Sequence, residues 1–129
     1  MEINEITYVI RGAVFEVNKI LGPGFLEKVH ENALLVELRR LGLKAESQVP
    51  IKVLYKENTV GEYSADILVE EQVIVELKTV EALDNVHEAQ LLNYLKATRI
   101  NVGLLVNFKH PKAELKRMVL NLSEGHNAQ

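Results

Sequence analysis

Two charged residues interrupt an apolar segment in the middle of the chain. Residues 73–80 read VIVELKTV, and the alternation of a strand places Glu76 and Lys78 on one face, together with Ile74 and Val80. An unpaired charge inside a sheet costs several kcal/mol, so it is kept where it is paired or bound to a metal. Such a pair is more commonly exposed on a one-sided sheet, so this spacing alone is weak evidence for a site.

An aspartate in the preceding segment strengthens the case. A tight turn at residues 70–72 makes strand pairing symmetric about Glu71, which brings Asp66 opposite Glu76, within about 5 Å at Cβ. Between Glu57 and Glu76 the chain has six acidic residues and no Lys or Arg. Like charges that face each other destabilise a sheet, whereas a hard divalent cation binds carboxylate oxygens. The sequence therefore predicts that Asp66 and Glu76 form a metal-binding pair.

The first third of the chain has the pattern of a helical hairpin. Apolar residues recur at three- and four-residue steps over residues 4–21, which predicts an amphipathic helix. Residues 22–24, Gly-Pro-Gly, break that helix, and a second helix is predicted over residues 25–41, ending at Gly42. The residues expected to pack from the second helix are Val29, Ala33, Val36 and Leu38.

The middle of the chain has the alternation of a β-meander. Strands are predicted over residues 49–55, 59–69 and 73–80, separated by polar turns. Pro50 lacks an amide hydrogen, which favours an edge position for the first strand.

The last third combines a helix with a buried strand. Asp84 or Asn85 can cap a helix that reaches about Thr98, and residues 101–108 form the apolar run of a buried strand. Residues 112–122 fit either a last helix or an edge strand. The positions expected to pack from the helix are Val86, Ala89, Leu91, Leu92 and Leu95.

Length and composition indicate one α/β domain. The chain has 129 residues, 47% of them hydrophobic, which suits a single core. The element order ααβββαβ predicts a mixed central sheet flanked by helices, with one strand added in parallel through the third helix. The expected parts of this single domain, residues 1–129, are a helical hairpin (1–42), a β-meander (49–80) and a helix–strand unit with a C-terminal element (85–122).

Charge and targeting signals exclude several classes of protein. Fifteen Lys and Arg residues against eighteen Asp and Glu residues give a net charge of −3, so a nucleic-acid contact would have to be local. The absence of cysteine excludes disulfides and thiolate chemistry. The N-terminus lacks the pattern of a signal peptide, and no apolar run is long enough to cross a membrane, so we expect a cytoplasmic protein.

The set of Asp66, Glu76 and Lys78 resembles the motif of the PD-(D/E)xK nuclease superfamily. Glu76-Leu77-Lys78 stands for the E-x-K of that motif, about ten residues after Asp66, and a helix and a strand follow it. Ala65 stands where the superfamily's name has proline, a position to which no chemistry is assigned. The resemblance implies a restriction-endonuclease-like layered fold.

A second motif narrows the resemblance. Residues 24–30, GFLEKVH, look like the signature of the small prokaryotic "GxxExxY" proteins, which are grouped with this superfamily. Gly24 and Glu27 match that signature, whereas His30 replaces its tyrosine. The resemblance extends from the first helix to about Leu120 and implies fold and site better than substrate.

Further site residues come from the same resemblance. Gln90 and Tyr94 match the Q-x-x-x-Y motif of RecB-like exonucleases and share one helix face, although alone they would be read as a surface amide and a core tyrosine. A helix-borne carboxylate is a common additional metal ligand in the superfamily, which favours Glu27, and the main-chain carbonyl of Leu77 is a further ligand by resemblance. His30 is expected near the rim of the site.

The resemblance implies metal-dependent hydrolysis of phosphodiester bonds in nucleic acid, with DNA favoured over RNA. Asp66 and Glu76 would hold Mg²⁺ or Mn²⁺, with Glu27 and Leu77 as further ligands. Lys78 would orient or deprotonate the attacking water, or neutralise charge on the phosphate. Gln90 and Tyr94 would position the water or the nucleic-acid backbone.

Two questions about partners stay open at the level of sequence. The alternative function is an inactive nuclease-fold module that binds nucleic acid or a protein partner. A single-site domain often dimerises to cut both strands, so a homodimer is compatible with the sequence. A local excess of +3 is either a phosphate-binding surface or ordinary solvated charge. Its residues are Lys109, Lys112, Lys116 and Arg117, against Glu114.

Overall fold

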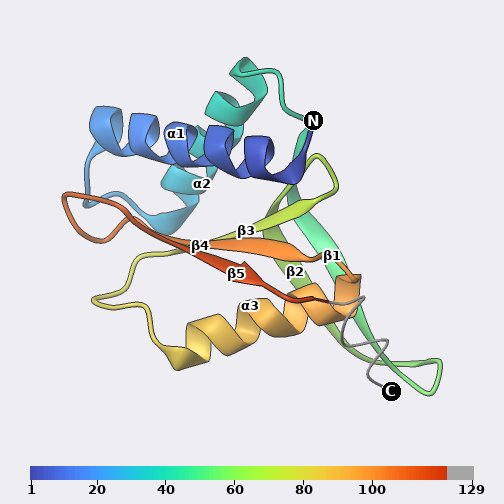
Figure 1. Cartoon of the computed structure of the whole chain (residues 1–129). Coiled ribbons are helices and arrows are strands. Elements are labelled where there is room, and N and C mark those ends of the chain that lie inside the picture. Colours follow the sequence, from blue (N-terminus) through green and yellow to red (C-terminus); the bar gives the residue numbers. More distant parts are fainter. Residues whose placement is uncertain (122–129) are drawn as a thin grey trace.

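Helices cover both faces of a five-stranded mixed sheet in the computed structural model, which describes residues 1–121 (Figure 1). One face carries α1 (Ile3–Leu21) and α2 (Glu27–Arg40), and α3 (Asn85–Thr98) crosses the other face. The strands are β1 (Ala45–Tyr55), β2 (Asn58–Val69), β3 (Val73–Lys78), β4 (Val102–Asn107) and β5 (Glu114–Val119). The predicted layered α/β fold with a mixed sheet is confirmed.

The strands follow the sheet in chain order, β1-β2-β3-β4-β5. All neighbours are antiparallel except β3 and β4, which run parallel because α3 connects them. This agrees with the predicted meander and crossover. The undecided segment after residue 112 is the edge strand β5, and Pro50 lies on the other edge strand, β1, which begins four residues before the predicted start.

Two apolar clusters hold the layers together. One joins α1 and α2 to the sheet and includes Ile10, Val14 and Val75, and the other joins α3 to the sheet through Leu91 and Leu95. Gly103 of β4 lies directly under α3, since a Cβ there would come within 2.9 Å of Leu91. This close approach sets the distance between α3 and the sheet.

The predicted packing face of α2 is right for Leu38, which is buried, and for Ala33, which packs against the core, but wrong for Val29 and Val36. Val36 is 60% exposed and Val29 is also exposed, whereas the buried face carries His30, Glu31, Leu34 and Leu38. The stripe at residues 30, 34 and 38 faces the core because the His30 ring stacks on Phe108 at the end of β4. Val86, another predicted packing residue, is exposed because it lies in the first turn of α3, ahead of the buried stripe.

The turn between β2 and β3 sets the register on which the site depends. Glu70 and Glu71 adopt left-handed φ values of 52° and 57°, and Gln72 N–H donates to Val69 O across the turn. Val69 therefore pairs with Val73, and the ladder continues to Ile67 and Val75. This is the register predicted from symmetry about Glu71.

No helix within residues 1–121 is long and apolar enough to span a membrane.

Candidate active site

Asp66 and Glu76 lie side by side where β2 and β3 begin to separate. The ladder ends at the pair Ile67–Val75, one step before these two residues. Asp66 N–H donates to Glu76 Oε1 at 2.8 Å, and Leu77 N–H donates to Asp66 Oδ2 at 2.8 Å. The two carboxylates thus accept bonds from main-chain donors at the point where ladder bonding stops, and the predicted closeness of the two residues is confirmed.

This arrangement opposes ionisation of both carboxyl groups. Glu76 is only 5% exposed, and burial, together with the negative charge of Asp66, raises its pKa to about 8. Burial also raises the pKa of Asp66, although the hydrogen bond from Leu77 N–H works in the opposite direction. At neutral pH, Glu76 therefore keeps its proton for much of the time.

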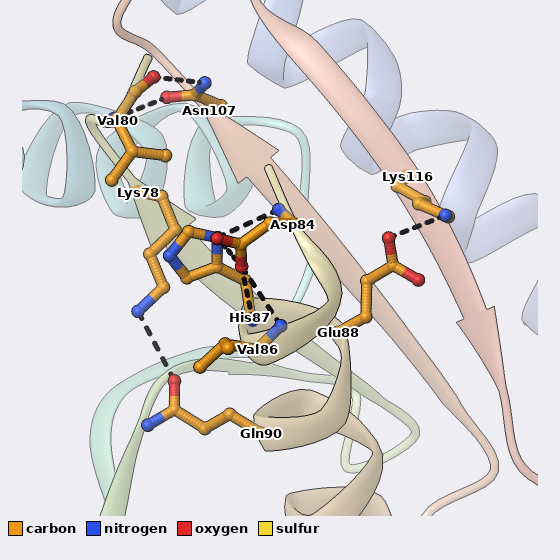
Figure 2. Close-up of polar contacts among 9 residues, drawn as sticks. All are labelled: Lys78, Val80, Asp84, Val86, His87, Glu88, Gln90, Asn107 and Lys116. Carbon is orange, nitrogen blue, oxygen red and sulfur yellow. Dashed lines mark hydrogen bonds and ion pairs between the residues drawn. The ribbon is translucent and has the colours of Figure 1, made fainter. Parts of the chain in front are cut away.

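Lys78 projects from the end of β3 towards α3. Its Nζ donates a hydrogen bond to Gln90 Oε1 at 3.3 Å (Figure 2). The charge of Lys78 lowers the pKa values of Glu76 and Asp66, but burial has the larger effect on both. Gln90 thus lies on the side of α3 that faces the carboxylates.

Tyr94 lies one helical turn beyond Gln90 and is buried. Burial and the charges of Glu76 and Asp66 raise the pKa of its phenol. The structure therefore brings both residues of the predicted Q-x-x-x-Y motif to the carboxylate pair, while their roles stay predictions.

Glu27 brings a third carboxylate from the start of α2. It accepts a hydrogen bond from the Thr79 N–H, just after β3. Burial raises the pKa of Glu27, the charge of Asp66 raises it further, and Lys78 lowers it. Glu27 thus lies beside the site, as predicted. Leu77 contributes its N–H to Asp66, and a ligand role for its carbonyl stays a prediction.

Asn107 fixes the end of β3, a function that sequence reasoning missed. Its buried amide accepts from Val80 N–H at 3.1 Å and donates to Val80 O at 2.8 Å (Figure 2). Phe108 N–H also donates to Lys78 O at 3.0 Å. The available signal was the asparagine at the end of the apolar run 101–108.

Gln48 and Glu31 form a second group that sequence reasoning missed. Gln48 lies on β1 between the residues that pair on either side of Asp66, and its φ of 51° is left-handed. Its Nε2 donates to Asp66 Oδ1 at 3.3 Å and to Glu31 Oε2 at 3.0 Å. Glu31 is buried, and it also accepts from Ser47 Oγ and pairs with Lys28. Nothing in the residue types indicates the backbone conformation that turns Gln48 towards Asp66.

His30 does not lie at the rim of the site, which corrects the prediction. Its ring is fully buried, stacks on Phe108 with ring centroids 4.5 Å apart, and contacts Gly22 O through Nε2 at 2.9 Å. His30 and Glu27 are three residues apart on α2, but α2 turns His30 into the core between the helices and the sheet. His30 is a packing residue.

The cationic segment around β5 is largely engaged in local contacts. Lys116 pairs with Glu88 of α3 at 2.8 Å (Figure 2), and Arg117 donates to Asn4 Oδ1. Lys109 lies 3.8 Å from Glu81. These contacts favour the interpretation of ordinary surface charge over that of a phosphate-binding surface.

The donor set at the carboxylate pair suits a small hard cation. Within residues 1–121, no group of three or more His, Asp or Glu side chains is arranged to hold one ion. Asp66 and Glu76 provide two carboxylates, and Mg²⁺ is commonly bound by one or two carboxylates, water and substrate phosphates. The residues therefore fit a cation that is held partly by its substrate.

The layered fold and the Asp66, Glu76 and Lys78 set define a protein of the restriction-endonuclease-like class. A family model described as the PD-(D/E)XK nuclease superfamily matches residues 4–118, and the chain belongs to that superfamily. Nucleases of this superfamily typically use divalent metals.

A solved structure titled "Crystal structure of SSO0001" is similar, with a TM-score of 0.54 and 18% sequence identity. The match covers 75% of this chain and 52% of that chain, so this chain spans about half the length of the solved one, and the likeness concerns the fold alone. No curated protein sequence matches the chain significantly.

Proposed function

We propose that this protein hydrolyses phosphodiester bonds in nucleic acid with Mg²⁺ or Mn²⁺, and that DNA is its substrate. The observation that carries the proposal is the Asp66–Glu76 pair beside Lys78, in which the buried Glu76 accepts a hydrogen bond from the N–H of the half-buried Asp66. The partial match of residues 24–30 to the GxxExxY signature supports a place among those small proteins.

Asp66 and Glu76 would act as the ligands. Glu76 must first lose its proton, because only the carboxylate ligates strongly. Glu27 and the carbonyl of Leu77 are the next candidates, since both lie beside the pair. A bound divalent cation would neutralise phosphate charge and lower the pKa of a water molecule.

Lys78 would bind and orient a water molecule or a phosphate oxygen of the substrate. Its ammonium group reaches Gln90 Oε1, so the lysine and the amide can together position a water molecule or a phosphate oxygen. Tyr94 would support the same surface from the next turn of α3. Asn107 and Gln48 are positioning residues, because the first fixes the end of β3 and the second contacts Asp66.

A cleavage screen tests the proposal. Single- and double-stranded DNA and RNA are incubated with the protein in Mg²⁺, Mn²⁺ or EDTA. We expect products only with a divalent cation, and none from the Glu76→Ala variant. Cleavage that survives EDTA or survives Glu76→Ala contradicts the proposal.

A non-catalytic module is the second candidate, and a specific observation favours it. Both carboxylates already accept main-chain hydrogen bonds, so the pair is satisfied in part without a metal. Such a module binds nucleic acid or a protein partner equally well with and without divalent cations. An enzyme requires them for turnover, which separates the two functions.

A further inference from the structure

A groove of about 990 Å³ runs between the β1–β2 hairpin and α3. Gln90 and Tyr94 form part of its lining, and Gln90 is the residue that binds Lys78. The groove therefore adjoins the two α3 residues that lie beside the carboxylate pair. It is at the upper end of the range of about 300–1,000 Å³ that small-ligand pockets occupy, so it can accept several linked chemical units.

The charged residues that line this groove in the described part of the chain are cationic. Lys52 lines it from β1, and Lys96 and Arg99 line it from the end of α3. Among residues 1–121, no Asp or Glu lines the groove, although the chain as a whole has a net charge of −3. No ion pair within residues 1–121 involves any of these three cations. The groove therefore favours an anionic occupant.

The cations line the groove from both β1 and α3. Lys96 is six residues beyond Gln90 on α3, which corresponds to about 9 Å along the helix axis. Cations near a helix C-terminus also interact with the helix dipole, which accounts for Lys96 and Arg99 alone but not for Lys52 on the opposite wall. A nucleic-acid backbone, with its repeated negative charges, would explain why cations line both walls of the groove.

Tyr63 supplies a surface for a nucleobase. Its side chain lines the groove from β2 and is 51% exposed, and its ring lies 5.5 Å from that of Tyr94. An exposed aromatic ring in a groove that also carries cations is an arrangement that binds single strands, because unpaired bases can stack on the ring. In a duplex the bases stack on one another, so their faces are not accessible to the Tyr63 ring.

We propose that this groove binds a single-stranded segment of nucleic acid and leads it to the carboxylate pair. Lys52, Lys96 and Arg99 contact phosphates, and Tyr63 stacks on a base. The proposal rests on the proposed function, since it names the form of the substrate for the same site.

Binding is measured in EDTA by fluorescence anisotropy, so that no cleavage occurs. The probes are labelled single strands of DNA and RNA of about 12 nucleotides and a duplex of the same length. We expect either single strand to bind more tightly than the duplex. We expect Tyr63→Ala to weaken single-strand binding by about fivefold or more, while Tyr63→Phe retains it.

The salt dependence isolates the phosphate contacts. Each of Lys52→Gln and Lys96→Gln is expected to reduce the slope of log affinity against log salt by about 0.7, the value for one single-strand phosphate contact. Lys112→Gln is the matched control, because Lys112 is exposed and lies outside the groove lining. Equal binding of duplex and single strand, or groove variants that behave like Lys112→Gln, would overturn the proposal.

Cleavage assays separate this proposal from the proposed function. If the groove variants bind nucleic acid like the parent and still cleave it with a divalent cation, the groove proposal is wrong. The proposed nuclease function then stands. If binding depends on the groove residues but no metal condition gives cleavage, the groove proposal stands. The proposed nuclease function is then wrong. Asp66→Asn should lose cleavage while it keeps single-strand binding.

Discussion

Glu76 is the residue whose ionisation the fold opposes most strongly. Its pKa in the folded protein is about 8, above the ordinary value of 4.5, so the folded state holds a proton that the unfolded chain releases. The contribution of Glu76 to stability is therefore complete below about pH 4.5 and falls as pH rises towards about 8. Thermal melts in EDTA should show this decline, and Glu76→Gln, which keeps the Oε1 acceptor, should flatten it. If the stability of Glu76→Gln declines with pH as that of the parent does, the decline comes from other titratable groups.

Asp66 tests whether the two carboxylates repel each other in the metal-free protein. Asp66→Asn keeps the acceptor for Leu77 N–H but removes a half-buried charge, so in EDTA the variant should be more stable by about 1 kcal/mol. With Mg²⁺ the order should reverse, because ligand binding to the folded parent stabilises it. Calorimetric melts measure both differences. Identical melting with and without metal would indicate ordinary surface charges.

Lys78 separates binding of the metal from the reaction. Lys78→Ala should retain binding of Mn²⁺, because the proposed ligands are carboxylates, and should lower the rate of hydrolysis by about 10²–10³-fold. Lys109→Ala is the control, since Lys109 is an exposed lysine beyond the end of β4. Turnover measurements at saturating metal test this, and a rate equal to that of the control would remove Lys78 from the reaction.

At the scale of elements, α2 is anchored by a polar residue. His30 stacks on Phe108 and contacts Gly22 O, so it ties α2 to β4 and to the loop after α1. His30→Ala should lower the free energy of unfolding by about 2–4 kcal/mol, as expected when a buried ring and its hydrogen bond are lost. Denaturant titration measures this change. Val29→Ala, on the exposed side of α2, is the control, and an equal effect of the two substitutions would show that His30 is not a core residue.

Elements with strong local signals could be predicted from the sequence. The turn at Glu70 and Glu71 determined the register that brings Asp66 to Glu76, and Asp84 caps α3 through Val86 and His87 N–H groups. These features depend on a few neighbouring residues.

Features that depend on tertiary contacts could not be predicted. The buried face of α2 is set by the stacking of His30 on Phe108, which is far away in the sequence. The contact of Gln48 with Asp66 requires a left-handed backbone conformation that glutamine rarely adopts. The choice between strand and helix after residue 112 was settled by pairing with β4.

At the scale of the molecule, the fold gathers charges that oppose one another. Three carboxylates come from α2, β2 and β3, and α3 adds Gln90 and Tyr94 from the other side of the sheet. The layers therefore meet at the point where β2 and β3 separate. A site that costs stability when empty is typical of sites kept for function.

Calorimetric titration of the full chain with Mn²⁺, in two buffers of different ionisation enthalpy near neutral pH, tests the central claim most directly. Glu76 must lose its proton in order to ligate, so binding should release about one proton for each ion bound. We expect such binding for the parent and much weaker binding for Glu76→Gln. Absence of binding, binding without proton release, or equal affinity of the parent and Glu76→Gln would contradict the account.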